Sequence, residues 1–143
     1  MRFLHQLILA LIGTCLLLKI GTAAEKEAPQ FIEGTVRVSA EEIVELVEMH
    51  DDLVLINSRN NTEKKAPYIE GSVNLSPKDT YSASLARFIH DKTTPVVFYC
   101  KDISHDCSAK AAKIAAAEGY LNIYWFRGGI QEWQKKGYPV VQP

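Results

Sequence analysis

The amino-acid sequence predicts an α/β domain with a mainly parallel central sheet of about five strands and helices on both faces. Short apolar runs alternate along the chain with segments of helical periodicity. Helical crossovers of this length join parallel strands. The runs 53–56 and 96–99 are continuously apolar, which is typical of strands covered on both faces. The chain has 143 residues, enough for one domain.

The order of elements follows from these patterns. Ser39 and Glu42 form a capping box in front of an apolar helical face, so a helix begins there. Gly119 is a suitable end for the helix that opens at Ser108. We expect strands over 35–38, 53–56, 72–75, 96–99 and 123–126, and helices after Ser39, between 79 and 90, over 108–118 and over 130–136.

The first 24 residues have the pattern of a secretory signal. A polar start with Arg2 precedes the apolar stretch 7–18 and small residues over 21–24. The stretch is shorter than the roughly 20 residues that span a bilayer, and Lys19 ends it; a retained anchor is the alternative. We expect a signal peptide (1–24), a flexible lead-in (25–34) and one domain (35–143). The mature chain is then periplasmic or secreted, without stable membrane insertion.

Net charge and cysteine content exclude some classes of partner and fold. The leader holds Arg2 and Lys19 of the 16 basic residues, which leaves 14 against 17 acidic residues and a net charge of −3. That balance argues against a nucleic-acid or anionic-membrane partner. Loss of Cys15 leaves Cys100 and Cys107, and one pair is too few for a disulfide scaffold. The pair is therefore available for chemistry.

Cys100 is the strongest candidate for a reactive residue. It ends the apolar run 95–100, and a short polar loop then leads into an alanine-rich helix. This places the thiol at the carboxyl end of a buried strand, where open α/β sheets bind ligands. The amides and the dipole of the next helix stabilise a thiolate there. A nucleophilic or sulfur-carrying role is the first interpretation, and an inert structural cysteine is the second.

Six segments in order resemble the rhodanese family. The segment 53–59 is similar to its strand ending in Asp-x-Arg, with Asn57 replacing the aspartate, and 68–74 is similar to its His-Ile-x-Gly-Ala-x-Asn segment, with Tyr68 replacing the histidine. The others are 97–100 with the cysteine, 108–112 at the helix start, 127–130, and Trp133 with 137–139. The resemblance covers roughly residues 35–143 and identifies the domain as rhodanese-like.

The resemblance implies sulfur transfer. In rhodaneses the cysteine thiolate takes a sulfane sulfur from a small donor, becomes a persulfide, and passes the sulfur to a thiol or protein acceptor. Cys100 maps onto this cysteine, and the family implies no cofactor; we expect a monomer. Arg59 maps onto the arginine after the second strand. It either pairs with a carboxylate near the strand end or helps to hold the loop.

The loop after Cys100 departs from the family. It is longer than usual, with Lys101, Asp102, Ile103, Ser104, His105, Asp106 and Cys107 before the helix-opening Ser108. Ile103 stands where the family has a glycine, and a β-branched residue does not easily adopt positive φ. Asp102 and Asp106 put negative charge near an anionic donor, which Lys101 and His105 compensate in part. Ordinary thiosulfate activity is therefore disfavoured.

Cys107 makes the chain unusual and leaves several interpretations open. It resembles the second cysteine of a set of exported rhodanese-like proteins. It either resolves a persulfide on Cys100 by thiol exchange or forms a disulfide that only fixes the loop. With His105, the two thiols also suggest a soft-metal site for Cu(I) or Zn(II), although three ligands are too few for a closed zinc site. The alternative function is a non-catalytic module that binds a partner or such a metal through the same cleft.

Overall fold

The structure is a computed structural model that describes residues 27–60, 62 and 65–143. The predicted signal peptide therefore lies outside the described residues. In the part of the chain that is described, no helix combines the length and the apolar character needed to cross a bilayer.

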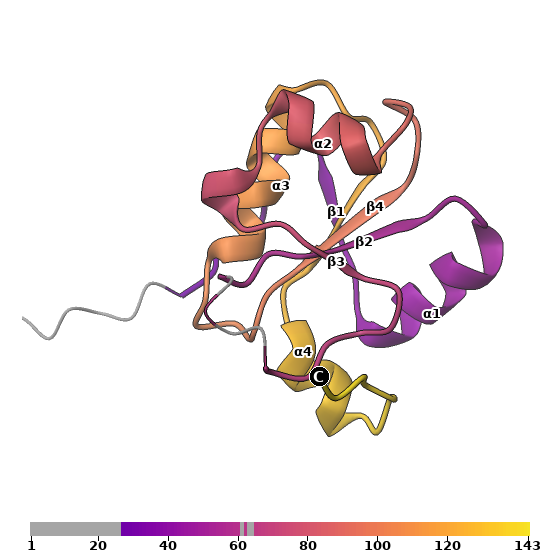
Figure 1. The fold of residues 1–143 in the computed structure, drawn as a ribbon, viewed down its shortest axis with the longest axis vertical. Helices are drawn as coiled ribbons and strands as arrows, with labels where there is room; N and C mark the ends of the chain where they lie inside the picture. The colour runs from indigo at the N-terminus through magenta and orange to yellow at the C-terminus, as the bar shows by residue number, and fades with distance from the viewer. Residues whose placement is uncertain (1–26, 61, 63–64) are drawn as a thin grey trace, which may run out of the picture.

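Five parallel strands form one sheet in the order β1-β5-β4-β2-β3 (Figure 1). The strands are β1 (Thr35–Arg37), β2 (Val54–Asn57), β3 (Val73–Asn74), β4 (Val96–Tyr99) and β5 (Ile123–Phe126). The helices are α1 (Ala40–Met49), η2 (Pro77–Asp79, a 3-10 turn), α2 (Ser82–Phe88), α3 (Cys107–Ala117) and α4 (Gly129–Lys135). The parallel α/β architecture predicted from the sequence is confirmed.

The central strand β4 shows why both faces of the sheet are covered. Val96 and Phe98 belong to a core cluster with residues of α2 and α3. Val97 and Tyr99, which alternate with them, belong to a second cluster with residues of α1 and α4. Successive side chains of a strand point to opposite faces, so a strand buried on both sides is continuously apolar. The carboxyl end of β4 therefore lies between two helical layers.

Local sequence signals fix several helix ends. Ser39 and Glu42 form the predicted capping box, with Ser39 N donating to Glu42 Oε2 at 2.7 Å and Glu42 N to Ser39 Oγ at 3.2 Å. Gly119 takes a φ of +85° just after α3 and ends that helix, as predicted. The segment 79–90 holds a shorter helix than its apolar pattern indicated, because Ser84 caps the start of α2 through the backbone of Tyr81.

Residues 27–34 differ from the flexible lead-in expected from their polar composition. Ala28 and Ile32 are buried in the same cluster as α2 and α3, each 3 % exposed. Arg127 holds this segment by donating from Nε to the carbonyl of Pro29 at 2.9 Å and from Nη2 to that of Ala28 at 2.9 Å. The segment is part of the domain because a buried arginine, far away in sequence, supplies its hydrogen bonds.

Candidate active site

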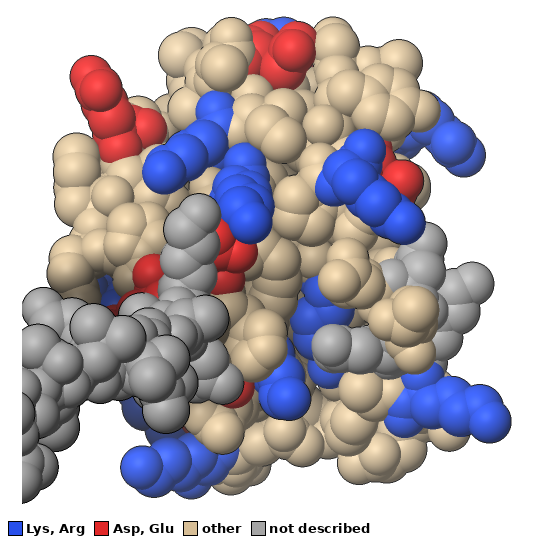
Figure 2. Space-filling model, turned by 90° about the vertical axis from the view of Figure 1, so that its left-hand side faces the viewer, with Lys and Arg blue, Asp and Glu red and all other residues tan. Residues whose placement is uncertain are grey.

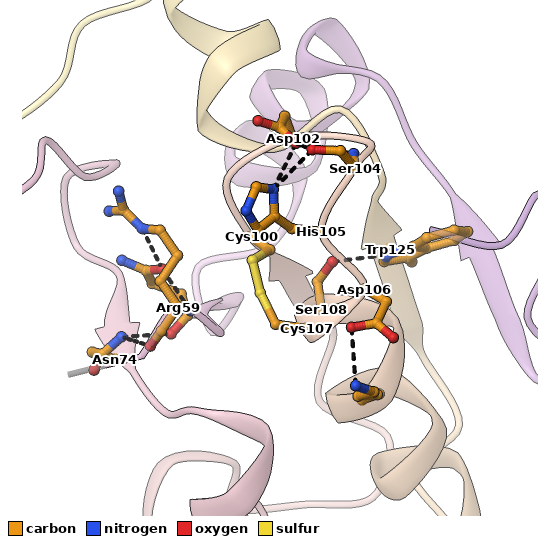
Figure 3. Close-up of a disulfide and its surroundings, with 12 residues drawn as sticks. Arg59, Asn74, Cys100, Asp102, Ser104, His105, Asp106, Cys107, Ser108 and Trp125 are labelled. Carbon is orange, nitrogen blue, oxygen red and sulfur yellow. Dashed lines mark hydrogen bonds and ion pairs between the residues drawn. A yellow bond between two sulfur atoms is a disulfide. The ribbon is translucent and has the colours of Figure 1, made fainter. Parts of the chain in front are cut away.

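Cys100 and Cys107 are joined by a disulfide at the carboxyl end of the sheet (Figure 3). Cys100 directly follows β4, and Cys107 is the first residue of α3. Their Cα atoms are 6.0 Å apart, within the usual range for a disulfide. The bond places the sulfur of Cys100 at the first turn of α3, as the strand–loop–helix pattern predicted.

The two cysteines are unequally exposed. Cys100 is 3 % exposed and belongs to the core, whereas Cys107 is only half-buried. A molecule arriving from solvent therefore has better access to Cys107 than to Cys100. Cleavage by attack on the Cys107 sulfur would release Cys100 as a thiolate beside the amides of the first turn of α3, where a thiolate is stabilised.

The carboxylate of Asp102 organises the loop between the cysteines. Its Oδ1 accepts hydrogen bonds from Ser104 N at 2.9 Å, Ser104 Oγ at 2.6 Å and His105 Nδ1 at 2.7 Å. Burial raises the pKa of Asp102, but the hydrogen bonds from Ser104 and His105 outweigh burial and bring the pKa below its ordinary value. The carboxylate is thus ionised and already engaged by its own loop.

The second acidic residue of the loop has its own partner. Asp106, which precedes α3, forms an ion pair of 3.0 Å with Lys110 one turn into that helix. The sequence pattern predicted that Lys101 and His105 compensate the two aspartates in part. In the structure Asp102 is instead hydrogen-bonded by Ser104 and His105, Asp106 is paired with Lys110, and Lys101 is exposed. The pairing is decided by the helical spacing of four residues.

Ile103 fits the loop without the left-handed backbone that a glycine would allow. Within the described ranges, positive φ angles occur only at glycines. Ile103 is 46 % exposed, and its carbonyl accepts a hydrogen bond of 2.7 Å from Ala28 N. The longer loop therefore reverses direction with ordinary backbone angles, and it is hydrogen-bonded to the N-terminal segment.

The start of α4 holds the other side of the loop. Ile130 N donates to the carbonyl of Cys100, and Gln131 N donates to that of Lys101, each at 3.0 Å. Gly129 permits this approach because it has a φ of +61° and because a Cβ there would lie 2.5 Å from the Cys100 carbonyl oxygen. The sequence showed this glycine only as part of the resemblance over 127–130.

Two supporting residues have partners other than those expected. Ser108 is not the cap of α3; its Oγ lies in the buried first turn and accepts a hydrogen bond from Trp125 Nε1 at 3.0 Å. Among the residues that the structure describes, Arg59 pairs with no carboxylate. Its Nε donates to Asn57 Oδ1 at 3.1 Å and its Nη2 to the carbonyl of Pro67 at 2.6 Å. Because Asn57 replaces the family's aspartate, the guanidinium of Arg59 donates its hydrogen bond to a neutral amide oxygen rather than to a carboxylate.

A cavity of about 370 Å³ adjoins the exposed side of the disulfide. Its volume is at the lower end of the range for small-molecule sites. The residues that line it come from the loop between the cysteines, from the segment after β2, from η2 and from α3. They are Asn60, Pro77, Lys78, Ser104, His105, Asp106, Cys107 and Lys110. Asn60 and Lys78 could not be predicted as site residues, because no sequence motif connects them to the loop.

The structure does not add support for the soft-metal interpretation. In the residues that the structure covers, no three His, Cys, Asp or Glu side chains gather in an arrangement suited to a metal ion. His105 Nδ1 is instead directed at Asp102.

Comparison with known proteins agrees with the fold. Residues 39–136 match the Rhodanese-like domain. The chain is 30 % identical over 107 residues to the Rhodanese domain-containing protein CG4456 of Drosophila melanogaster, covering 66 % of this chain and 94 % of that protein.

Solved structures give the same picture. The polysulfide-sulfur transferase homodimer of Wolinella succinogenes superposes with a TM-score of 0.63 and 26 % identity, over 77 % of this chain and 80 % of that one. A rhodanese-related protein of Thermoplasma volcanium superposes with a TM-score of 0.56 and 25 % identity, over 74 % and 97 % of the two chains. With the parallel sheet and the cysteine at the end of its central strand, these matches show that the chain belongs to the rhodanese-like domain family.

Proposed function

We propose that this protein is a sulfurtransferase in which Cys100 carries a sulfane sulfur as a persulfide and Cys107 resolves it. The observation that carries the proposal is the bond between a buried cysteine at the end of β4 and the half-buried first residue of α3. A resolving thiolate must be able to attack the sulfur of the cysteine that carries the persulfide. The disulfide between Cys100 and Cys107 is the bond that such an attack forms.

The proposed cycle balances as two displacements. The Cys100 thiolate attacks the sulfane sulfur of a donor, forming the Cys100 persulfide and expelling the rest of the donor as an anion. The Cys107 thiolate then attacks the Cys100 Sγ atom, forming the disulfide and releasing the outer sulfur as hydrosulfide. The cysteine pair is oxidised and the sulfane sulfur is reduced. Two external thiols return the disulfide to the dithiol.

A polysulfide or an organic persulfide fits the loop better than thiosulfate as the donor. Asp102 and Asp106 lie in the loop between the two cysteines, and their negative charges disfavour a compact dianion, although Asp102 is hydrogen-bonded within the loop and Asp106 is paired with Lys110. Longer sulfur chains spread their charge away from the attacked atom. The similarity to a protein named a polysulfide-sulfur transferase supports the same class of donor.

The test is mass spectrometry of the reduced protein after brief exposure to polysulfide. We expect Cys107→Ser to accumulate one added sulfur atom on Cys100, since it lacks the resolving thiol. Wild type should release hydrosulfide and return to the disulfide. Cys100→Ser should do neither, and sulfur transfer by that variant at the wild-type rate would refute the proposal.

Export is part of the proposal. A disulfide between the two cysteines that remain after loss of a leader is consistent with an oxidising compartment. We expect the mature chain to begin near Ala24 or Glu25 and to be periplasmic or secreted. N-terminal sequencing of the exported protein tests this, and a chain that retains Met1 contradicts it.

A further inference from the structure

One ring nitrogen of His105, Nε2, has no hydrogen-bond partner among the described residues, and His105 lines the same cavity as Cys107. His105 Nδ1 lies 2.7 Å from Asp102 Oδ1, and Ser104 Oγ bonds to the same oxygen at 2.6 Å. A neutral imidazole that donates from Nδ1 to a carboxylate keeps a lone pair on Nε2. The Asp102 contact therefore both orients the ring and selects the tautomer that can accept a proton.

His105 and the more exposed sulfur share one cavity. The side chain of His105 is 45 % exposed, and both His105 and Cys107 line the 370 Å³ space at the start of α3. In Figure 3 the imidazole lies between Asp102 and the disulfide. A small molecule in this cavity can meet a proton acceptor and the Cys107 sulfur together.

We propose that this cavity is a binding site for a small anionic thiol, in which His105 is the general base that activates the thiol for attack on Cys107. The site would supply the reductive step of the cycle above. This inference rests on the proposed function in one respect, namely that the reduced Cys100 and Cys107 pair is the form that reacts with the sulfur donor.

The step conserves atoms and electrons. The thiol proton moves to His105 Nε2, and the thiolate attacks the Cys107 Sγ atom. The bond between the two protein sulfurs breaks, and its electron pair leaves on Cys100 as a thiolate. A second thiol loses its proton to solvent and attacks the sulfur of the first thiol in the mixed disulfide, so that the two small molecules leave as their disulfide and Cys107 is expelled as a thiolate. The proton on His105 then moves to Cys107, and Cys100 remains a thiolate.

The charges around the cavity favour an anionic thiol. Lys78 from η2 and Lys110 from α3 line it together with Asp106, and Asp102 lies behind His105. Lys110 is paired with Asp106, whereas among the described residues no salt bridge involves Lys78. Figure 2 shows that basic side chains, with acidic ones among them, are spread over the face that lies on the left in Figure 1. A carboxylate on the thiol can therefore be met by Lys78.

The first experiment measures the rate of disulfide reduction in the oxidised, leader-free protein by labelling the free thiols after quenching. The probes are mercaptopropionate and the neutral tris(hydroxypropyl)phosphine, which attacks sulfur without giving up a proton. His105→Gln keeps a donor for Asp102 but lacks the base. We expect this variant to slow reduction by mercaptopropionate at least about tenfold near pH 7 and to leave the phosphine rate unchanged. His90→Gln, an exposed histidine outside the loop, is the control.

A pH series separates a base from a structural residue. Above the pKa of the thiol itself, the nucleophile is already ionised, so the rates of wild type and His105→Gln should converge. Equal slowing with thiol and phosphine at every pH, or no slowing with either, would overturn the assignment. The assay needs no sulfur donor, so its result is independent of whether Cys100 forms a persulfide.

Two thiols of opposite charge test the binding site. We expect mercaptopropionate to react severalfold faster than cysteamine after correction for their intrinsic reactivities. Lys78→Gln should abolish that preference, and Lys113→Gln, which removes an exposed lysine elsewhere on α3, should keep it. A preference that is unchanged in Lys78→Gln, or absent in wild type, would refute an anionic-thiol site.

Discussion

The indole Nε1 of Trp125 donates a hydrogen bond of 3.0 Å to Ser108 Oγ, and both residues are 1 % exposed. This bond joins the middle of β5 to the first turn of α3, one residue after Cys107. Because that turn carries one of the two sulfurs, the bond fixes the distance between the sheet and the reactive loop. A hydroxyl that resembles a helix cap in the sequence is in fact a tether to the core.

Ser108→Ala should lower the free energy of unfolding by about 1–3 kcal/mol, because it leaves the indole N–H buried without an acceptor. Urea unfolding of the oxidised protein measures the change. Ser82→Ala removes an exposed hydroxyl from the start of α2 and should be nearly neutral. Equal stability of the two variants would show that the Trp125 bond contributes nothing.

Gly129→Ala tests the contact between α4 and the reactive loop. The new Cβ would meet the carbonyl oxygens of Cys100 and Lys101 at 2.5 and 2.7 Å. Gly119 has a similar φ of +85° but no heavy atom within 4 Å of the added carbon, so Gly119→Ala isolates the backbone cost. We expect Gly129→Ala to be less stable than Gly119→Ala by about 1–3 kcal/mol, the usual cost of overpacking. Matching unfolding midpoints would contradict this contact.

Arg127→Lys should loosen the N-terminal segment while keeping the charge. Lysine cannot reproduce the fork that serves the carbonyls of Ala28 and Pro29. Loss of these bonds should speed hydrogen exchange at Ala28 N, which is bonded to the Ile103 carbonyl, by about tenfold or more. Arg87→Lys, on exposed α2 surface, is the control. Unchanged exchange in Arg127→Lys would mean that burial of Ala28 alone holds the segment.

Asp102 should make the loop sensitive to acid. The hydrogen bonds to this carboxylate hold its pKa in the folded protein below the ordinary value of about 4. Its contribution to stability is therefore complete above that value and is lost as pH falls through the lower, folded pKa. The difference in unfolding free energy between wild type and Asp102→Asn should be largest near pH 6 and shrink towards pH 2. A difference that grows with acid would reverse the assignment, and Asp51→Asn, outside the loop, controls for net charge.

Patterns among residues close in sequence were sufficient to predict the five strands and the four α-helices, but not the 3-10 turn η2. The apolar run 96–99 predicted the central strand, and the spacing of Ser39 and Glu42 predicted the start of α1. These signals are local, since a strand buried on both faces needs apolar residues at every position and a cap needs a polar side chain at a fixed offset. The position of Cys100 after that strand was predictable for the same reason.

Partners that are distant in sequence were not predictable from such patterns. Ala28 and Ile32 are too few apolar residues to mark 27–34 as packed, and the segment is ordered because Arg127 reaches it from the end of β5. The carbonyls that approach Gly129, and Lys78, which lines the same cavity as Cys107, belong to elements that only the folded sheet brings together.

The sequence by itself determined the parallel α/β class, the family resemblance and the identity of the two cysteines, because periodicity and motif order are properties of the chain alone. Only the tertiary structure decided that Cys100 is buried and Cys107 half-buried, and that the carboxylate of Asp102 accepts hydrogen bonds from Ser104 and His105 within its own loop. Burial and hydrogen-bond partners depend on which surfaces meet once the crossovers close. The chemistry of the loop is therefore set by packing as well as by residue type.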